Sequence, residues 1–191
     1  MLQIENTPFE INCLLDDRPM IYVACLAAYN DGYLHGQWID ATQGEESVWE
    51  EIKAMLQASP IPEAEEWAIH DSSGFYNYEV GEGADIDKLC IIASMIYEAD
   101  EEDNGKGYLM SHLINDYGIS GAEEQLKDHF YGEYDSDLDF AYEYIDDTCM
   151  LENVPKSVLM YFDYEAFARD IMINDFYSVE TDDKNYYFHN N

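Results

Sequence analysis

The excess of carboxylates is the feature that most restricts what this chain can become. The sequence has 42 Asp and Glu residues against 8 Lys and Arg, which gives a formal net charge of −34 at pH 7. Such a charge opposes compaction by self-repulsion. Disordered acidic chains lack apolar residues, whereas 47% of this chain is hydrophobic and 15% is aromatic. The sequence therefore predicts a folded protein with an acidic surface and not an acidic tail.

The same imbalance limits the partners of the protein. Binding to phosphate needs clusters of Lys and Arg, and the sequence has none, so direct contact with nucleic acid or with an anionic membrane surface is excluded. The longest apolar run, residues 20–29, is far too short to span a membrane, and we expect no secretory signal. The scattered cysteines show no CxxC pattern and are expected to be reduced and mostly buried. These features predict a cytoplasmic protein.

The first part of the chain predicts a small sheet with one helix. Residues 20–29 are rich in Val, Ile, Tyr and Ala, and Asn30-Asp31-Gly32 is typical of a hairpin turn, so we expect strands over 20–29 and 33–39. A helix with an acidic outer face is expected over 45–57, and a third strand over 66–70. The inward positions of this helix are Val48, Ile52, Met55 and Leu56.

The middle of the chain predicts helices. Asp85 stands at an N-cap position ahead of apolar residues that recur at core spacing as far as Tyr97. Residues 100–107 are expected to form an acidic loop. A short helix should follow and be broken by Gly118 and Gly121.

The last part of the chain predicts strands around an amphipathic helix. We expect one strand over 129–134 and a hairpin of two strands over 176–180 and 185–189. The helix between them has an acidic outer face. Its inward positions are Leu138, Ala141, Tyr142 and Ile145.

This order of elements predicts an α+β protein built as an elongated chain of three small domains. The N-terminal α+β domain would comprise residues 1–80, with a leader over 1–19. A central helical domain is expected over 81–126. The C-terminal α+β domain would comprise residues 127–191.

Motifs for catalysis or metal binding fail when they are compared with this sequence. Asp100 begins a calcium-loop pattern, but its twelfth position is Ser111, where a bidentate Glu is required. His70-Asp71-Ser72-Ser73 contains the residue types of a hydrolase triad, but no GxSxG elbow accompanies them. The histidines lack the spacing of a zinc site. We therefore expect no enzyme, no cofactor and no metal.

Residues 154–171, VPKSVLMYFDYEAFARDI, have the clearest local plan. Pro155 favours a turn or the start of a short helix. Asp163 stands at an N-cap position, and the apolar residues after it are spaced as one buried stripe of a helix. These features alone predict a helical hairpin that completes a core.

The same segment closely resembles VPxSLxxYFDYEAYARDL of the ArdA family of antirestriction proteins. Residues 21–41, IYVACLAAYNDGYLHGQWIDA, resemble the N-terminal signature of that family, and residues 66–71, EWAIHD, resemble the segment that closes its first domain. The three matches occur in the order and spacing of the family. Lys156 and Phe167 stand where the family has Glu and Tyr, and the leader is longer.

The resemblance implies a DNA mimic that dimerises through its C-terminal part. Such a protein occupies the DNA-binding groove of type I restriction–modification enzymes and so protects an incoming mobile genetic element from cleavage. The charge is of a suitable size, because duplex DNA carries one charge per ~1.7 Å, and 34 net charges therefore match roughly 58 Å of duplex.

Two groups of residues would then carry the function. The mimic surface is expected to consist of exposed acids from all three predicted domains: Glu45, Glu46, Glu50, Glu51, Glu65, Glu66, Asp71, Asp100, Glu101, Glu102, Asp103, Glu123, Glu124, Asp137, Asp139, Glu143, Asp146 and Asp147. An apolar segment is expected to belong to the antirestriction motif that the resemblance implies and to the contact between the two copies of a homodimer: Met150, Leu151, Val154, Pro155, Val158, Leu159, Tyr161 and Phe162.

Two other functions remain open at this point. An acidic adaptor would bind another basic DNA-binding protein, such as a nucleoid protein or a repressor, and would not affect restriction. A weak hydrolase or a metal-binding protein would show turnover or bound metal.

Overall fold

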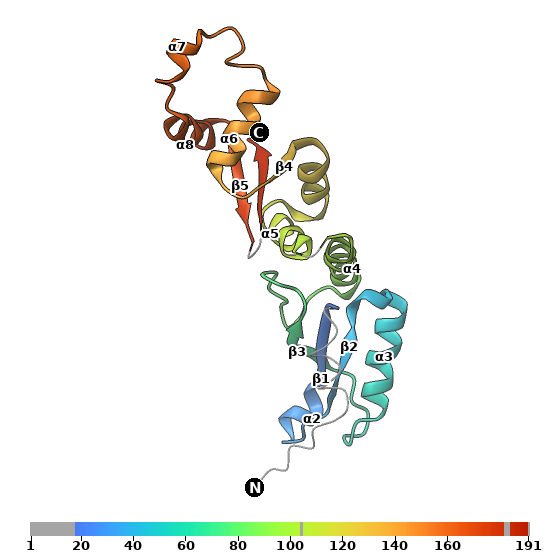
Figure 1. Cartoon of the computed structure of the whole chain (residues 1–191). Helices are drawn as coiled ribbons and strands as arrows, with labels where there is room; N and C mark the ends of the chain where they lie inside the picture. The colour runs from blue at the N-terminus through green and yellow to red at the C-terminus, as the bar shows by residue number, and fades with distance from the viewer. Residues whose placement is uncertain (1–17, 104, 182–183, 191) are drawn as a thin grey trace. The chain divides into compact units, whose positions relative to one another are not determined.

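The computed structural model of the protein describes residues 18–103, 105–181 and 184–190 (Figure 1). The fold is α+β, as predicted, with two three-stranded antiparallel sheets. The chain forms two compact units, Met1–Asn115 and Asp116–Asn191, which we call the N-terminal and the C-terminal unit. The division into three domains and their elongated arrangement stay predictions. Most of the predicted leader lies outside the described residues.

The sheet of the N-terminal unit contains β1 (Met20–Cys25), β2 (Gly36–Asp40) and β3 (Trp67–Ser73) in the order β2-β1-β3. β1 is the central strand and pairs antiparallel with both neighbours. Ile21 and Val23 of this strand are completely buried. Three strands were predicted here, and the prediction is confirmed.

The first strand is shorter than predicted, because the helix α2 (Leu26–Asn30) follows directly after β1. The Cys25 thiol accepts a hydrogen bond from the Ala28 amide at 3.5 Å and so caps this helix. Leu and Ala are strong helix formers, and this local preference prevails over the strand pattern. Asn30-Asp31-Gly32 is therefore not a tight hairpin turn, although Gly32 has the positive φ of 87° that a turn glycine allows.

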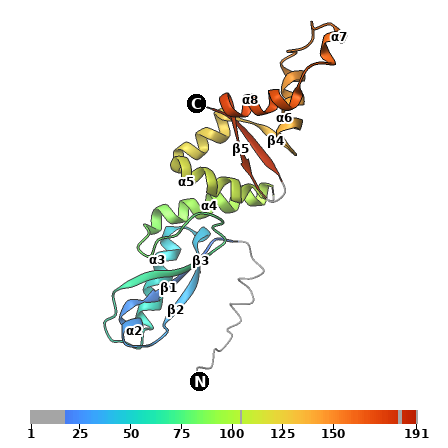
Figure 2. The same cartoon turned by 90° about the vertical axis from the view of Figure 1, so that its left-hand side faces the viewer.

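The predicted helix over 45–57 is α3 (Glu45–Gln57), which follows the short 3₁₀ helix η1 (Ala41–Gln43). Val48, Ile52 and Met55 are buried, as predicted. The helix packs against β1 and β2 on one side of the sheet (Figures 1 and 2).

The helix α4 (Ile86–Glu102) begins at Asp85, whose carboxylate accepts the Lys88 amide at 3.2 Å. The predicted N-cap is confirmed. The acidic loop predicted over 100–107 is wrong in its first part, because α4 continues through Glu102. Asp100 stabilises the connection, since its carboxylate accepts the amides of Gly105 and Gly107 at 3.1 and 3.3 Å.

The helix α5 (Lys106–Glu124) is interrupted at Gly118, where φ is 73° and ψ is 178°. Essentially only glycine adopts this conformation, so the predicted break is confirmed. Gly121 does not break the helix, which continues to Glu124 and into the π-helical turn η2 (Gln125–His129).

The sheet of the C-terminal unit contains β4 (Phe130–Tyr134), β5 (Phe176–Glu180) and β6 (Asn185–His189) in the order β4-β6-β5. The strand and the hairpin predicted here are confirmed. Tyr187 and Phe188 of the central strand are buried.

Phe140 occupies the centre of the core of the C-terminal unit. It belongs to α6 (Asp137–Asp147), which packs against α8 (Tyr164–Asn174). Its ring stacks on Tyr187, with the ring centroids 4.6 Å apart. The predicted inward position of Tyr142 is wrong: this side chain is 48% exposed, whereas Phe140 is 0% exposed. Ala141 and Ile145 are buried, as predicted, and Leu138 is half-buried, so Phe140 takes the inward place that was predicted for Tyr142.

The segment between α6 and α8 contains the short helix α7 (Lys156–Leu159). Val158, Met160 and Tyr161 are 52, 74 and 82% exposed, so the first half of the predicted hairpin does not complete a core. The second half does, as predicted, because Ala168 and Ile171 of α8 are buried in the core of the C-terminal unit. Asp163 is the N-cap of α8, as predicted, and accepts the Ala166 amide at 2.9 Å.

No helix among the described residues is long and apolar enough to cross a membrane. Cys25 and Cys90 are buried free thiols, and Cys149 is an exposed one. Cys13 lies outside the described residues.

Candidate functional site: an acidic surface and an apolar segment

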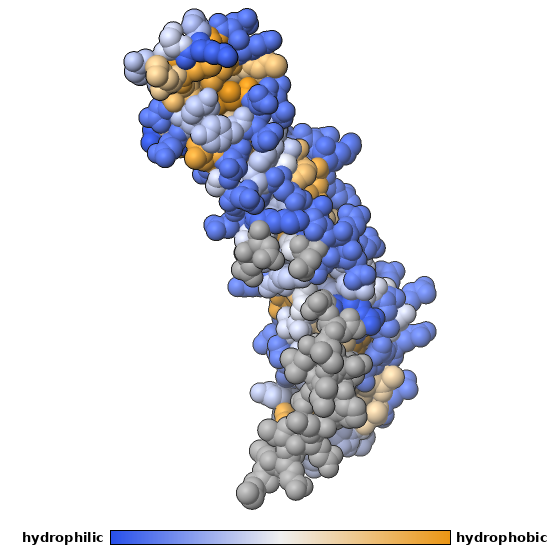
Figure 3. Space-filling model, in the orientation of Figure 1, coloured by the Kyte–Doolittle hydropathy of each residue, from blue (hydrophilic) through white to orange (hydrophobic). Residues whose placement is uncertain are grey.

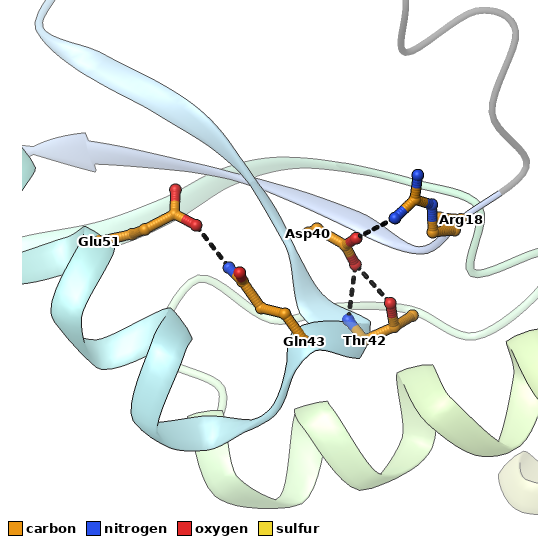
Figure 4. A network of polar contacts seen from close by, with 5 residues as sticks. All are labelled: Arg18, Asp40, Thr42, Gln43 and Glu51. Atoms are coloured by element: carbon orange, nitrogen blue, oxygen red, sulfur yellow. Dashed lines mark hydrogen bonds and ion pairs between the residues drawn. The ribbon is translucent and has the colours of Figure 1, made fainter.

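The predicted acids on α3 lie at a corner where β2, η1 and α3 meet. Glu45, Glu46 and Glu50 are exposed. Glu51 is half-buried, because its carboxylate accepts hydrogen bonds from Gln37 at 3.2 Å and Gln43 at 2.5 Å. Glu51 therefore helps to hold the corner together (Figure 4).

A further acid at this corner was not predicted. The Asp40 carboxylate accepts a hydrogen bond from the Arg18 guanidinium at 2.9 Å. It also accepts hydrogen bonds from the amide and the hydroxyl of Thr42 at 2.8 and 2.6 Å (Figure 4). Asp40 is therefore the N-cap of η1, and the Asp-x-Thr spacing at the end of a strand was the sequence signal for this cap. Asp40 is thus engaged within the fold.

The acids around β3 are exposed: Glu65 and Glu66 before the strand and Asp71 within it. Asp71 accepts the Ser72 amide at 2.8 Å, and the His70 ring packs edge-on against Tyr29 with the centroids 4.9 Å apart. These contacts do not form a nucleophile–base pair.

The acids at the end of α4 divide into two kinds. Glu101 and Glu102 are exposed, whereas Asp100 and Asp103 are half-buried. Asp100 supports the connection to α5, and Asp103 pairs with Lys106 at 3.7 Å. The sequence did not reveal this structural role, although Gly105 and Gly107 after Asp100 were a signal for a capped turn.

The acids of the C-terminal unit are exposed: Glu123 and Glu124 on α5, and Asp137, Asp139, Glu143, Asp146 and Asp147 on α6. Asp139 also takes part in the N-cap, because its amide donates to the Ser136 hydroxyl at 3.2 Å. On α6, Asp139, Glu143, Asp146 and Asp147 lie on one outer face, because positions i, i+4, i+7 and i+8 of a helix are neighbours.

Two carboxylates of α6 are held by tyrosines of the core. Tyr187 donates its hydroxyl hydrogen to Asp137 at 2.8 Å, and Tyr131 donates to Asp147 at 3.2 Å. Burial and the hydrogen bond to Asp147 raise the pKa of Tyr131 to about 12. This phenol therefore stays a protonated donor at physiological pH.

The following ion pairs lie mostly outside the predicted surface. Arg18 pairs with Asp40, Lys106 with Asp103 and Lys184 with Glu133. Two further pairs are Lys127–Asp128 and Arg169–Asp170. Of these carboxylates, Asp103 alone belongs to the predicted mimic surface.

Several acids lie where they oppose the helix dipole. Glu101 and Glu102 end α4, Asp146 and Asp147 end α6, and neither helix has a basic residue in its last turn. A negative charge at the carbonyl end of a helix is unfavourable by roughly 0.3–1 kcal/mol. Helix stability does not explain these acids.

The predicted apolar segment is largely exposed. Met150, Val158 and Tyr161 are 46, 52 and 82% exposed, and Pro155 is also exposed. Leu151, Val154, Leu159 and Phe162 are half-buried. Met160, which was not among the predicted residues, is 74% exposed. Apolar side chains gather at the end of the C-terminal unit that carries α7, whereas hydrophilic ones dominate the rest of the face shown (Figure 3).

Within the described parts of the chain, no three His, Cys, Asp or Glu side chains lie close enough together to hold a metal ion.

The comparisons with known proteins identify the family. The family model described as antirestriction protein (ArdA) matches residues 21–184. This range contains the three segments whose resemblance to the family is described above. A search of the curated proteins gives no match. The chain belongs to the ArdA family of antirestriction proteins.

Proposed function

We propose that the protein inhibits type I restriction–modification enzymes by presenting carboxylates in place of the phosphates of duplex DNA. The observation that carries this proposal is the exposed acids at the ends of α4 and α6, which oppose the helix dipole and lack a basic residue beside them in the last turn. Charges that disfavour the helix are best explained by a partner that binds them.

The spacing of the acids supports the proposal. Asp139, Glu143 and Asp147 recur every fourth residue on α6 and form one row of exposed carboxylates. Neighbours at this spacing lie about 5–6 Å apart. Like charges at this distance disfavour the helix, and they resemble successive charges along a phosphate backbone.

The mechanism requires no chemical step. A DNA-binding groove neutralises phosphates with Lys and Arg, and a fixed polyanion competes for the same side chains. Binding releases counterions from both surfaces, so the affinity should fall steeply with salt. Unmodified incoming DNA then escapes cleavage because the groove is occupied.

The apolar segment has a separate role in this proposal. We infer that Met150, Val158 and Tyr161 contact a second copy of the chain, because exposed apolar side chains that lie together mark interaction sites. A dimer would place two acidic surfaces on one inhibitor.

A competition assay tests the proposal. The protein is titrated against a type I restriction enzyme bound to labelled duplex that carries its target sequence, at two salt concentrations. We expect displacement of the DNA near stoichiometric protein and much weaker displacement at the higher salt. Absence of displacement by folded protein would reject the proposal for that enzyme and favour an acidic adaptor for another basic DNA-binding protein.

A matched pair of variants makes the assay sharper. Glu101→Gln with Asp146→Asn removes two acids that oppose the helix dipole, so it should raise stability while it weakens displacement. Asp128→Asn with Asp170→Asn removes two acids that already have a cation beside them, so displacement should weaken less. Equal weakening by both variants would show that only total charge matters.

A further inference from the structure

The N-terminal unit has an open depression of about 470 Å³ beside α3. We call it the Trp49 depression. Its lining residues are Glu45, Glu46, Trp49, Glu50, Lys53 and Asp87. All except Asp87, which belongs to the first turn of α4, lie on α3. An aromatic side chain thus stands in a hollow that is otherwise lined mainly by carboxylates.

The Trp49 ring is fixed from two sides. Its Nε1–H donates to the Asp87 carboxylate at 3.1 Å. Trp67 of β3 meets it edge-to-face, with the ring centroids 5.6 Å apart and the planes at 81°. Side chains from two other elements, α4 and β3, therefore set the orientation of the indole before any ligand arrives, which lowers the entropic cost of binding.

The lining attracts a flat cation, because its four carboxylates outnumber the single ammonium of Lys53 and leave a net charge of −3 (four negative, one positive). Glu46 and Glu50 are four residues apart on α3 and therefore lie on the same face of the helix as neighbours. A guanidinium group can lie on an indole and donate hydrogen bonds to carboxylates in its own plane. An ammonium group is a compact, strongly hydrated charge and uses the ring less well.

We propose that the Trp49 depression binds the guanidinium group of an arginine side chain presented by the partner protein. This inference rests on the proposed function, because a DNA-binding groove is rich in arginine. It adds one localised, arginine-selective contact to an attraction that is otherwise spread over the whole acidic surface.

Short basic peptides of equal charge test the inference. Hexa-arginine and hexa-lysine are titrated into the full chain by calorimetry, and the fluorescence of the tryptophans is recorded. We expect the wild-type protein to prefer hexa-arginine, and Trp49→Leu to reduce this preference by roughly 2- to 5-fold, the size of an exposed cation–π contact. Binding of hexa-lysine should change little. The matched control is Tyr33→Leu, which removes an aromatic residue that is 52% exposed and lies outside the depression.

A folded Trp49→Leu variant that keeps the full preference for arginine would overturn the inference. If this variant fails to fold, two charge variants decide. Glu46→Gln with Glu50→Gln should weaken hexa-arginine binding more than Glu123→Gln with Glu124→Gln, which removes the same charge from α5. If both double variants lose the same affinity for hexa-arginine, the inference is also overturned.

The two proposals can fail separately. If wild-type protein displaces DNA from the restriction enzyme but Trp49→Leu shows no loss of arginine preference, the depression has no selective role and charge mimicry stands. If wild-type protein displaces no DNA, the proposed function fails whatever the peptides show.

Discussion

Truncation of Phe140 should destabilise the C-terminal unit more than any change on its acidic surface. The side chain is completely buried, and its ring lies within 4.8 Å of Phe176 and 4.6 Å of Tyr187, measured between centroids. Replacing a core Phe with Ala leaves a cavity and typically costs about 3–5 kcal/mol. With a urea dependence of roughly 1–3 kcal/mol per M, the midpoint of unfolding should fall by about 1–5 M.

Tyr142→Ala is the matched control, because it shortens an aromatic side chain on the same helix. Tyr142 is 48% exposed and contacts the Tyr164 ring at 4.6 Å, so its loss should cost only about 0.5–1.5 kcal/mol. Unfolding is followed by circular dichroism and by tyrosine fluorescence. Tryptophan fluorescence reports on the N-terminal unit alone, since Trp38, Trp49 and Trp67 all lie there.

Equal destabilisation by the two substitutions would refute the assignment of Phe140 to the core. A shift of the tryptophan transition as large as that of the circular dichroism signal would show that the two units unfold together.

Three further predictions concern a cap, a titration and the dimer. Asp163→Ala removes the N-cap of α8 and should lower the free energy of unfolding by about 1 kcal/mol, whereas Asp163→Asn should lower it less. Urea unfolding of both variants tests this, and equal losses of stability would refute the role of Asp163 as the cap. The pKa of Tyr131 is raised from 10.0 to about 12 in the folded protein, so its protonated phenol stabilises the fold. This stabilisation is fully present below pH 10, where the phenol is protonated in both states, and is lost as the pH rises towards 12. Tyr131→Phe should flatten the loss of stability with pH over this window, as measured by thermal unfolding, and an unchanged pH profile would contradict the shift. Met160→Glu should convert a dimer to a monomer in light scattering after size exclusion, with Ile173→Glu, at a site that is 70% exposed outside the segment, as a control that stays dimeric.

The sequence was informative where local chemistry decides the structure. The cap residues Asp85 and Asp163 were identified because a carboxylate ahead of an apolar stripe satisfies the first free amides of a helix. It was uninformative where tertiary contacts decide. The choice between Phe140 and Tyr142 as the inward residue depends on which face of α6 meets α8 and the sheet, and both residues suit a core.

The acidic surface was predictable in outline and not in detail. Exposure of the acids on α6 follows from their charge alone. The internal engagement of Glu51 was not predictable, because its partners come from β2 and η1. For Asp100 and Asp103 the glycines that follow indicated a capped turn, but the contacts themselves depend on the residue at which α4 ends.

The tyrosine–carboxylate contacts of α6 make it possible to change the position of a charge without changing the net charge of the protein. Tyr187 and Tyr131 reach outward from the core and restrict the carboxylates of Asp137 and Asp147. Replacing either tyrosine with Phe would leave the net charge at −34 and release one carboxylate. A partner that responds only to the amount of charge would bind such a variant unchanged, whereas a partner that reads a fixed pattern would bind it more weakly.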